Sequence, residues 1–364
     1  MTLLEDCCEI LDSMRVPITA KDRKKGPYPY YGANGVQDYV ADYIFDDELV
    51  LLAEDGGNFG SEERPIAYKV SGKCWVNNHA HVLKPKVGID VDYLCYSLMF
   101  YKVEGMVNGA TRMKLTQAAM RKMLIPLRKI EEQKQIVRVL NRIQMLIKAE
   151  RKQIIKYDEL IKSRFVELFG DPVSNSFHLP EATLPELGEF GRGVSKHRPR
   201  NAPELLGGSY PLIQTGEVAA AKLYITSYEN TYSELGFRQS KMWNKGTLCI
   251  TIAANIAKTA ILGFNACFPD SVVGFNANEK TNNIFIHYWF SFFQTILEAQ
   301  APESAQKNIN LKILGELKVI VPPVDKQKEF VLFVQRTDEM KSTVQKRLNK
   351  LQTLQKSLMQ QYFG

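Results

Sequence analysis

Residues 130–170 read IEEQKQIVRVLNRIQMLIKAERKQIIKYDELIKSRFVELFG, and residues 324–364 read VDKQKEFVLFVQRTDEMKSTVQKRLNKLQTLQKSLMQQYFG. When the chain is shifted by 194 residues, so that Gly170 meets Gly364, the longer segments 110–170 and 304–364 align without a gap. Two copies at so long a period are unlike a solenoid, whose repeats span roughly 20–50 residues. The repeat therefore predicts a duplicated module and a molecule with two similar halves.

An apolar stripe runs along the first copy, with apolar residues mostly every three or four positions and one interruption at Glu150. The second copy keeps this register, but it has Lys341 where the first has Ile147 and Val344 where the first has Glu150. Such a stripe, free of Gly and Pro, predicts an unbroken helix of roughly 57 Å in each copy. We expect the two helices to pair antiparallel as a coiled coil. The alternative is that each helix only caps its own domain.

Globular stretches precede the two helices, at residues 1–125 and, after a proline-bearing linker, within 171–317. Their short β-branched and aromatic runs, broken by Gly, Asn and Asp, predict mixed α/β domains with many loops. With long helices at 126–170 and 318–364, the predicted fold is α+β, with two mixed α/β domains separated by the helix pair and related by a pseudo-twofold axis. The halves match at their ends and diverge between, which fits two readers of different targets or drift after duplication.

The formal net charge of +7 is concentrated on the predicted helices. Residues 126–170 hold 11 Lys and Arg against 6 Asp and Glu, and residues 318–364 hold 9 against 4, so the rest of the chain sums to −3. The globular domains can therefore bind DNA only through local patches. The six cysteines lack Cys-x-x-Cys spacing, so we expect buried free thiols in a reducing cytoplasm. The sequence predicts neither a signal peptide nor a membrane span.

Sequence motifs for catalysis are missing. Neither Pro322-Pro323 nor Asp171-Pro172 continues into the Asn/Asp-Pro-Pro-Tyr/Phe pocket in which an adenine methyltransferase receives a flipped base. No Gly-Lys-Ser/Thr loop would hold ATP. His79 and His81 alternate as on a strand without a Cys or carboxylate cluster nearby in sequence, so we expect no metal site. We predict a non-enzyme that binds no cofactor.

A fixed order of motifs runs twice along the chain: a variable domain, a proline approach, an acidic first turn followed by Gln-Lys, and a long helix. In the first copy these motifs are Ile125-Pro126, Glu131-Glu132-Gln133-Lys134 and Leu168-Phe169-Gly170-Asp171-Pro172. The second copy departs slightly, with Asp325-Lys326-Gln327 in place of the double acid and Gln. Over its whole length the chain resembles the specificity subunit of a type I DNA restriction–modification system.

The resemblance implies that each globular domain is a target recognition domain reading one half of a split, asymmetric and gapped DNA sequence. The paired helices would set the gap and dock two methyltransferase subunits, which would bind S-adenosylmethionine and methylate adenine N6. Restriction subunits that translocate DNA could join. The chain itself would be a non-catalytic, cytoplasmic DNA-binding subunit. Two other hypotheses remain open: a non-catalytic recognition region of a split methyltransferase, and a coiled-coil protein scaffold.

Loops rich in DNA-reading residue types lie at matched places in the two halves. Arg and Lys read guanine and Asn and Gln read adenine, while Lys, Arg, Ser and Thr also hold phosphates. We predict DNA contacts at Lys24, Asn34, Asn58, Asn78, His79, Arg112, Lys114, Lys196, Arg198, Thr215, Asn255, Lys258, Gln306, Lys307 and Asn308. We predict partner contacts at Gln133, Arg142, Gln327 and Arg336. For the loop residues, a solvated charged loop or a turn is the alternative interpretation.

Overall fold

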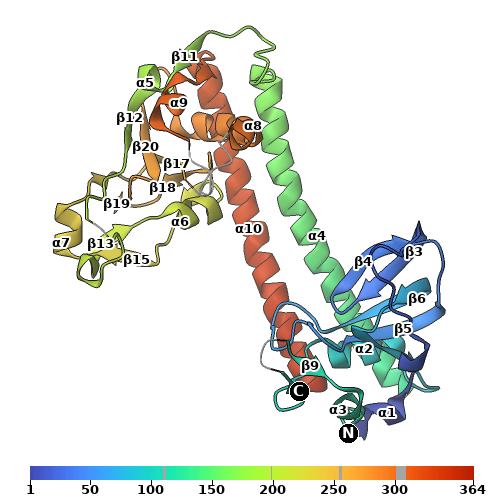
Figure 1. Ribbon diagram of the computed structural model, residues 1–364. Coiled ribbons are helices and arrows are strands. Elements are labelled where there is room, and N and C mark those ends of the chain that lie inside the picture. Colours follow the sequence, from blue (N-terminus) through green and yellow to red (C-terminus); the bar gives the residue numbers. More distant parts are fainter. Residues whose placement is uncertain (110–111, 198, 254–255, 301–308) are drawn as a thin grey trace. The chain divides into compact units, whose positions relative to one another are not determined.

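The computed structural model describes residues 1–109, 112–197, 199–253, 256–300 and 309–364. Spatial contacts divide the chain into unit 1, which comprises Met1–Lys152 and Gln345–Gly364, and unit 2, which comprises Gln153–Val344. Each unit holds one globular part and the adjoining portions of both long helices (Figure 1). Within the described ranges, no helix is both long enough and apolar enough to cross a membrane.

The two long helices are α4 (Ile130–Phe169) and α10 (Val324–Phe363). Each has 40 residues and is therefore about 60 Å long. In unit 1 the beginning of α4, with Ile136 and Leu140, packs against the end of α10 at Leu358. In unit 2 the end of α4 packs against the beginning of α10, where the rings of Phe165 and Phe330 meet with centroids 5.3 Å apart. Both contacts require an antiparallel pair, which confirms the predicted pairing.

Unit 1 contains a six-stranded mixed sheet with the order β2-β7-β5-β6-β3-β4. The strands of the whole unit are β1 (Thr2–Leu3), β2 (Cys8–Ile10), β3 (Lys25–Gly32), β4 (Gly35–Val40), β5 (Phe45–Ala53), β6 (Ala67–Val76), β7 (Ala80–Pro85), β8 (Val107–Asn108), β9 (Lys114–Leu115) and β10 (Leu124–Ile125). Its short helices are α1 (Leu4–Cys7), η1 (Asp12–Met14), α2 (Val91–Met99) and α3 (Gln117–Arg121). The apolar run 49–53 supplies the buried centre of this sheet within β5.

Helix α2 connects the sheet of unit 1 to the long helices (Figure 1). It begins at the N-cap Asp90, whose carboxylate accepts hydrogen bonds from the Asp92 and Tyr93 amides at 3.0 Å. Its aromatic side chains Tyr93 and Tyr96 pack on Ile136 and Leu140 of α4. The Tyr96 hydroxyl also lies 2.6 Å from Asn141 Oδ1, so α2 fixes the globular part of unit 1 onto the helix pair.

Unit 2 contains a five-stranded sheet, β12-β20-β17-β18-β14, and a four-stranded sheet, β15-β13-β19-β16. Its strands are β11 (Glu181–Thr183), β12 (Gly188–Arg192), β13 (Leu206–Leu212), β14 (Tyr224–Ile225), β15 (Asn230–Tyr232), β16 (Met242–Trp243), β17 (Leu248–Thr251), β18 (Thr259–Leu262), β19 (Ala266–Cys267), β20 (Val272–Ala277) and β21 (Lys318–Ile320). Apart from the long helices, the helices of unit 2 are α5 (Leu184–Leu187), η2 (Pro203–Leu205), α6 (Thr215–Ala220), α7 (Glu234–Arg238), α8 (Asn283–Gln300) and α9 (Leu311–Glu316).

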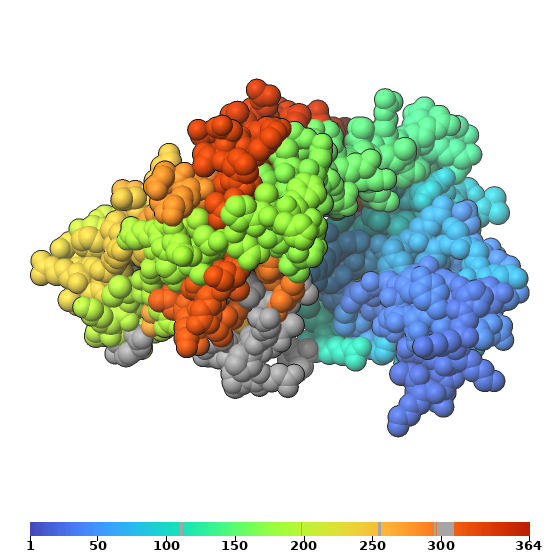
Figure 2. Space-filling model, turned by 90° about the horizontal axis from the view of Figure 1, so that it is seen from above, coloured from blue at the N-terminus to red at the C-terminus, as the bar shows by residue number. Residues whose placement is uncertain are grey.

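Helix α8 plays in unit 2 the part that α2 plays in unit 1. Phe285 of α8 stacks on Phe165 of α4, with ring centroids 5.3 Å apart, and Trp289 is fully buried in the same core. At this end of unit 2, Arg164 of α4 pairs with Glu329 of α10 at 2.6 Å. Figure 2 shows the green end of α4 and the linker after it beside the orange-red start of α10.

The ends of the two globular parts share one topology. In unit 1, β1 pairs antiparallel with β10, the last strand before α4, and α1 leads from β1 into the main sheet. In unit 2, β11 pairs antiparallel with β21, the last strand before α10, and α5 leads into the five-stranded sheet. Between these shared ends the sheets differ, as the divergent middles of the sequence predict. The fold is therefore α+β, with two mixed α/β parts and two long helices, as predicted.

Candidate nucleic-acid interface

A cluster of polar side chains on unit 1 brings together predicted DNA contacts from distant parts of the sequence. Nη2 of Arg112 donates to Asp55 Oδ1 at 2.9 Å, and the same oxygen lies 2.6 Å from His79 Nδ1. Asn34, in the turn between β3 and β4, donates from Nδ2 to the Gly56 carbonyl at 3.0 Å. Arg112 and Asn34 are exposed, while Asp55 and His79 are half-buried. We call these four residues the unit 1 cluster.

A pocket of about 420 Å³ adjoins the unit 1 cluster, and Arg112 and His79 form part of its wall. Asn78, another predicted contact, lines the same pocket and is exposed. The lining also includes Gln37, which sequence reasoning did not select, and Arg23, which belongs to the same basic loop as the predicted contact Lys24. The Arg23 guanidinium lies 4.3 Å from the centroid of the buried Tyr30 ring. This cation–π contact holds Arg23 at the rim, and sequence spacing gave no signal of it.

Beneath the unit 1 cluster lies a buried ionic network. His81 places Nδ1 2.7 Å from Asp12 Oδ2 and Nε2 2.9 Å from the Leu115 carbonyl oxygen. Arg15 pairs with Glu54 at 2.6 Å. Burial raises the pKa of Asp12, but hydrogen bonds from His81, the Val82 amide and Gln117 outweigh it and leave the pKa below its usual value. Asp12 is therefore a buried carboxylate that ties together strand β7 and the segment around β9.

The same network contains a group with metal-ligand chemistry. One ligand atom each from Asp12, Glu54 and His81 lies within 4.8 Å of the others. These atoms already have protein partners, because His81 bonds Asp12 and the Leu115 carbonyl, and Arg15 pairs with Glu54. A cation would have to displace the Arg15 guanidinium, so we assign the group a structural role. His81 thus supports the surface from below, whereas His79 lies at it.

The remaining predicted DNA contacts of unit 1 are Lys114, Asn58 and Lys24. Lys114, on β9, is exposed and pairs with Glu54 at 3.0 Å, directly beside the unit 1 cluster. Asn58 is half-buried in the loop after β5, where the positive φ belongs to Gly56 rather than to Asn58. Lys24 is exposed just before β3, and its carbonyl accepts from the Ala41 amide at 2.9 Å.

Three predicted DNA contacts of unit 2 lie on separate loops. Lys196 is exposed in the loop after β12, with its amide held by Gln239 Oε1 at 2.6 Å. Thr215 is the first residue of α6, and Lys258 lies in the connection between β17 and β18. Among the described residues, no hydrogen bond or ion pair joins these three into one cluster. The other predicted contacts of this half lie outside the described residues: Arg198, Asn255, Gln306, Lys307 and Asn308.

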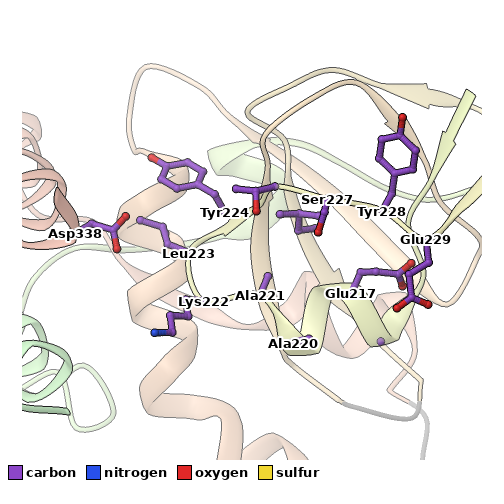
Figure 3. Close-up of a pocket in the computed structure, with 13 residues that line it drawn as sticks. Glu217, Ala220, Ala221, Lys222, Leu223, Tyr224, Ser227, Tyr228, Glu229 and Asp338 are labelled. Atoms are coloured by element: carbon purple, nitrogen blue, oxygen red, sulfur yellow. The ribbon is translucent and has the colours of Figure 1, made fainter. Parts of the chain in front are cut away.

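A larger pocket of unit 2, of about 720 Å³, adjoins Thr215 but has the wrong charge for DNA. Glu217 of α6 and Glu229 lie near one another on one side of it, and Asp338 of α10 lies on another (Figure 3). Lys222 is the one basic residue in its lining. Three carboxylates against one ammonium would repel a phosphate backbone, so we do not assign this pocket to DNA.

On α4, the predicted partner residue Gln133 is fully buried. Its Nε2 donates to the carbonyls of Gly88 and Arg128 at 3.0 and 2.9 Å, and its Oε1 accepts from the Asp90 amide at 2.9 Å. The side chain thus joins the first turn of α4 to the loop that begins α2. In this structure the glutamine serves the fold of unit 1.

The repeat-related Gln327 on α10 makes the matching contacts in unit 2. Its Nε2 donates to the carbonyls of Lys280 and Pro322 at 3.0 and 2.9 Å, and its Oε1 accepts from the Thr281 hydroxyl at 3.0 Å. These bonds join the first turn of α10 to the loop that begins α8. The other repeat-related pair among the predicted partner residues, Arg142 and Arg336, is exposed on the two helices. We therefore take the arginines as the candidate partner surface.

Fold and surface together define a modular binding protein. Each unit carries its own polar loops on a mixed α/β part, and each is built against one end of an antiparallel helix pair. The unit 1 cluster supplies Arg, Asn and His side chains of the types that read base edges. These features fit the class of sequence-reading DNA-binding proteins.

The chain belongs to the family of the type I restriction modification DNA specificity domain, whose model matches residues 2–157 and again residues 182–353. A Haemophilus influenzae protein named as a type I restriction enzyme specificity subunit is 26% identical over 353 residues, covering 94% of this chain and 88% of that protein. A Methanocaldococcus jannaschii protein named as the MjaX specificity subunit is 23% identical over 297 residues, covering 76% and 68%.

Solved structures share the fold. The S subunit of a type I restriction–modification system from M. genitalium matches with a TM-score of 0.59 at 14% identity, over 100% of this chain and 95% of that one. A chain from a structure of the assembly and conformational transition of the type I system matches with a TM-score of 0.53 at 13% identity, over 100% and 96%. As a member of this family, the chain is a non-catalytic subunit that recognises a DNA sequence within a type I complex.

Proposed function

We propose that the chain reads a split, asymmetric and gapped DNA target, with unit 1 on one half and unit 2 on the other. The observation that carries this proposal is that the two globular parts have the same ends and different middles. Unit 1 is built on one six-stranded sheet and unit 2 on a five-stranded and a four-stranded sheet. Identical readers would favour a palindrome, whereas these readers present different loops and so favour two different half-sites.

The same proposal gives the helix pair two tasks: to set the gap between the half-sites and to dock methyltransferase subunits. The helices repeat an exposed surface, because Arg142, Lys152 and Leu160 on α4 recur as Arg336, Lys346 and Leu354 on α10, and all six are exposed. A surface present twice can bind the same partner twice, which supports two methyltransferase subunits. Translocating restriction subunits would join that complex.

Chemistry in the proposed complex belongs to the partners. The methyltransferase subunits would bind S-adenosylmethionine and methylate adenine N6, and this chain would bind no cofactor of its own. Its contribution would be to position them on one sequence, in the cytoplasm where host DNA lies. Because the positive charge lies mainly on the helical segments, DNA affinity would be shared between the reading loops and the partners.

The decisive experiment is a genome-wide map of N6-methyladenine in the source cell, with the gene intact, deleted and restored. The expected result is that one gapped motif with two unlike halves disappears on deletion and returns on restoration. A palindromic motif would contradict the asymmetry, and a motif that persists without the gene would contradict the role in specificity. Binding of the purified chain to the mapped motif, measured at several salt concentrations, separates DNA reading from a scaffold role, since phosphate contacts give a steep salt dependence.

A further inference from the structure

We propose that Arg112 reads a guanine in the half-site of unit 1, and that Asp55 and His79 hold its guanidinium in the reading position. This inference rests on the proposed function, because it names the base that one half-site must contain. Arg112 is the donor, whereas Asp55 and His79 are positioning residues.

The geometry fixes the side chain without hiding it. Nη2 of Arg112 bonds Asp55 Oδ1 at 2.9 Å, and His79 Nδ1 lies 2.6 Å from that same oxygen. The Arg112 side chain is nevertheless 59% exposed, against 18% for Asp55. In the described part of the chain, its Nε and Nη1 have no hydrogen-bond partner. The guanidinium of Arg112 is therefore held at Nη2, faces solvent and keeps hydrogen-bond donors for a ligand.

Gly56 makes this position possible. A Cβ atom at Gly56 would lie 3.3 Å from Nε and 3.4 Å from Nη2 of Arg112, closer than most Cβ contacts. Its φ of +61° is also one that L-residues with a side chain rarely adopt. The Gly56 carbonyl in turn accepts the Asn34 amide at 3.0 Å. One glycine thus brings an arginine and an asparagine, the two side chains suited to guanine and adenine, to the same surface.

Charge favours a guanine over a phosphate as the ligand of Arg112. Arginine binds both, because its paired donors match guanine O6 and N7 as well as two phosphate oxygens. Here the Asp55 carboxylate lies against the guanidinium, and Glu54 lies next along the chain, paired with Lys114 at 3.0 Å. A phosphate at Arg112 would lie close to the Asp55 charge and be repelled. The edge of guanine offers two acceptors and carries no net charge, so it avoids this repulsion.

The anchor also reduces the loss of freedom on binding. A free arginine side chain gives up much rotamer entropy when it binds, and a guanidinium already held by a carboxylate has less to give up. Asp55 is therefore expected to strengthen guanine recognition although it is itself an anion. The direction in which DNA affinity changes when Asp55 is neutralised therefore tests the positioning role. If Asp55 acted only through its negative charge, its removal would strengthen DNA binding, whereas loss of a positioning residue weakens it.

The test uses the full-length chain and DNA selected from a random duplex library by that chain. Each guanine of the selected half-sites is then replaced, one at a time, by 7-deazaguanine, which lacks the N7 acceptor. We expect one position in one half-site at which the replacement weakens wild-type binding by about 5-fold or more. For Arg112→Ala, guanine and 7-deazaguanine should bind within about 2-fold of one another at that position, while the other half-site keeps its preferences.

Matched variants make the result specific. Arg121→Ala removes another, half-buried arginine of unit 1, which pairs with Glu5 at 3.2 Å, and should keep the wild-type pattern. Arg112→Lys keeps the charge but replaces the planar guanidinium by a single ammonium, so its sensitivity to 7-deazaguanine should fall between those of the wild type and Arg112→Ala. Asp55→Asn should weaken binding to the guanine probe and leave 7-deazaguanine binding nearly unchanged. Thermal melting of each variant verifies that it is folded.

Three outcomes would overturn the inference. In one, Arg112→Ala stays as sensitive to 7-deazaguanine as the wild type at every position. In another, Arg112→Ala weakens all sequences equally and lowers the salt dependence, which identifies a phosphate contact. In the third, Asp55→Asn strengthens binding. A wild-type chain that selects no sequence at all would instead contradict the proposed function itself, and this inference would fall with it.

Discussion

The two repeated glutamines make the clearest prediction at the scale of single residues. Gln133→Ala removes a side-chain amide that satisfies the Gly88 and Arg128 carbonyls and the Asp90 backbone amide. Leaving buried polar groups unpaired costs about 1–3 kcal/mol. We therefore expect a lower thermal midpoint and faster hydrogen exchange in residues 86–93 and in the first turn of α4. Gln327→Ala should do the same in the loop before α8 and the first turn of α10.

The neighbouring Gln135 provides a control for this prediction, because it is an exposed glutamine on the same helix. Gln135→Ala should change stability by less than about 0.5 kcal/mol and should leave hydrogen exchange as in the wild type. If Gln133→Ala matched this control, the glutamine would have no structural role, and a partner contact would again be the reason for its recurrence.

For single residues, the sequence was a better guide to which side chains are exposed on the surface than to the residues that they contact. Arg112 and Lys114 stood out because the repeat places them before the long helix, and the structure shows both exposed beside Asp55. Asp55 is absent from the predicted contacts, since nothing in its sequence neighbourhood indicates a contact with a residue 57 positions away. Gln133 and Gln327 show the same limit. Their recurrence in the repeat indicates a contact that is made twice. Only the fold shows that each glutamine makes this contact within its own unit.

At the scale of elements, a prediction follows from the ion pair in unit 2 that joins Lys341 of α10 to Asp158 of α4. Lys341 is 7% exposed and Asp158 is 53% exposed, so the two partners are not equivalent. Asp158→Ala leaves a buried ammonium without its partner, and we expect a loss of about 1–3 kcal/mol. Lys341→Met fills the same space with an apolar side chain and leaves Asp158 in water, so we expect a change below about 1 kcal/mol.

Urea unfolding followed by tryptophan fluorescence tests this asymmetry, because two of the three tryptophans, Trp243 and Trp289, are buried in unit 2. The double variant Asp158→Ala with Lys341→Met should recover most of the loss, because it removes the buried charge as well as its partner. Equal losses from the two single variants would mean that the attraction between the charges, rather than burial of the ammonium, determines the stability.

The elements themselves were largely predictable, because their signals are periodic and local. The stripe through Ile136, Leu140 and Ile161 is buried as expected. The interruption at Glu150 has a partner in unit 1, where Arg347 of α10 lies 3.0 Å away. The position of Lys341 indicated a departure from an apolar seam, but its partner could not be derived without the register of the two helices. The sheet orders of both units likewise depend on pairings between distant strands, which no local pattern specifies.

At the scale of the whole molecule, we expect each unit to read its own half of the DNA motif independently of the other. Arg112 belongs to unit 1 and Lys258 to unit 2. In the N6-methyladenine map, Arg112→Ala should relax one half of the motif, and Lys258→Ala should relax the other. In binding assays each should cost about 1 kcal/mol or more, and the double variant should lose the sum within about 0.5 kcal/mol. Loss of both halves from either single variant would show that the halves are read jointly.

Unit 2 is one continuous piece of chain, Gln153–Val344, whereas unit 1 is completed by Gln345–Gly364. The end of α10 supplies Leu358 and Phe363, which pack on the Tyr93 and Ile136 core of unit 1. A ribosome therefore finishes the second globular part before it has made the last segment of the first. During synthesis unit 1 therefore stays incomplete, with the apolar face of its part of α4 uncovered, until residues 345–364 have been made. A stop codon introduced just after codon 344 would thus leave the unit 2 segment whole and damage unit 1, most of which had been made earlier.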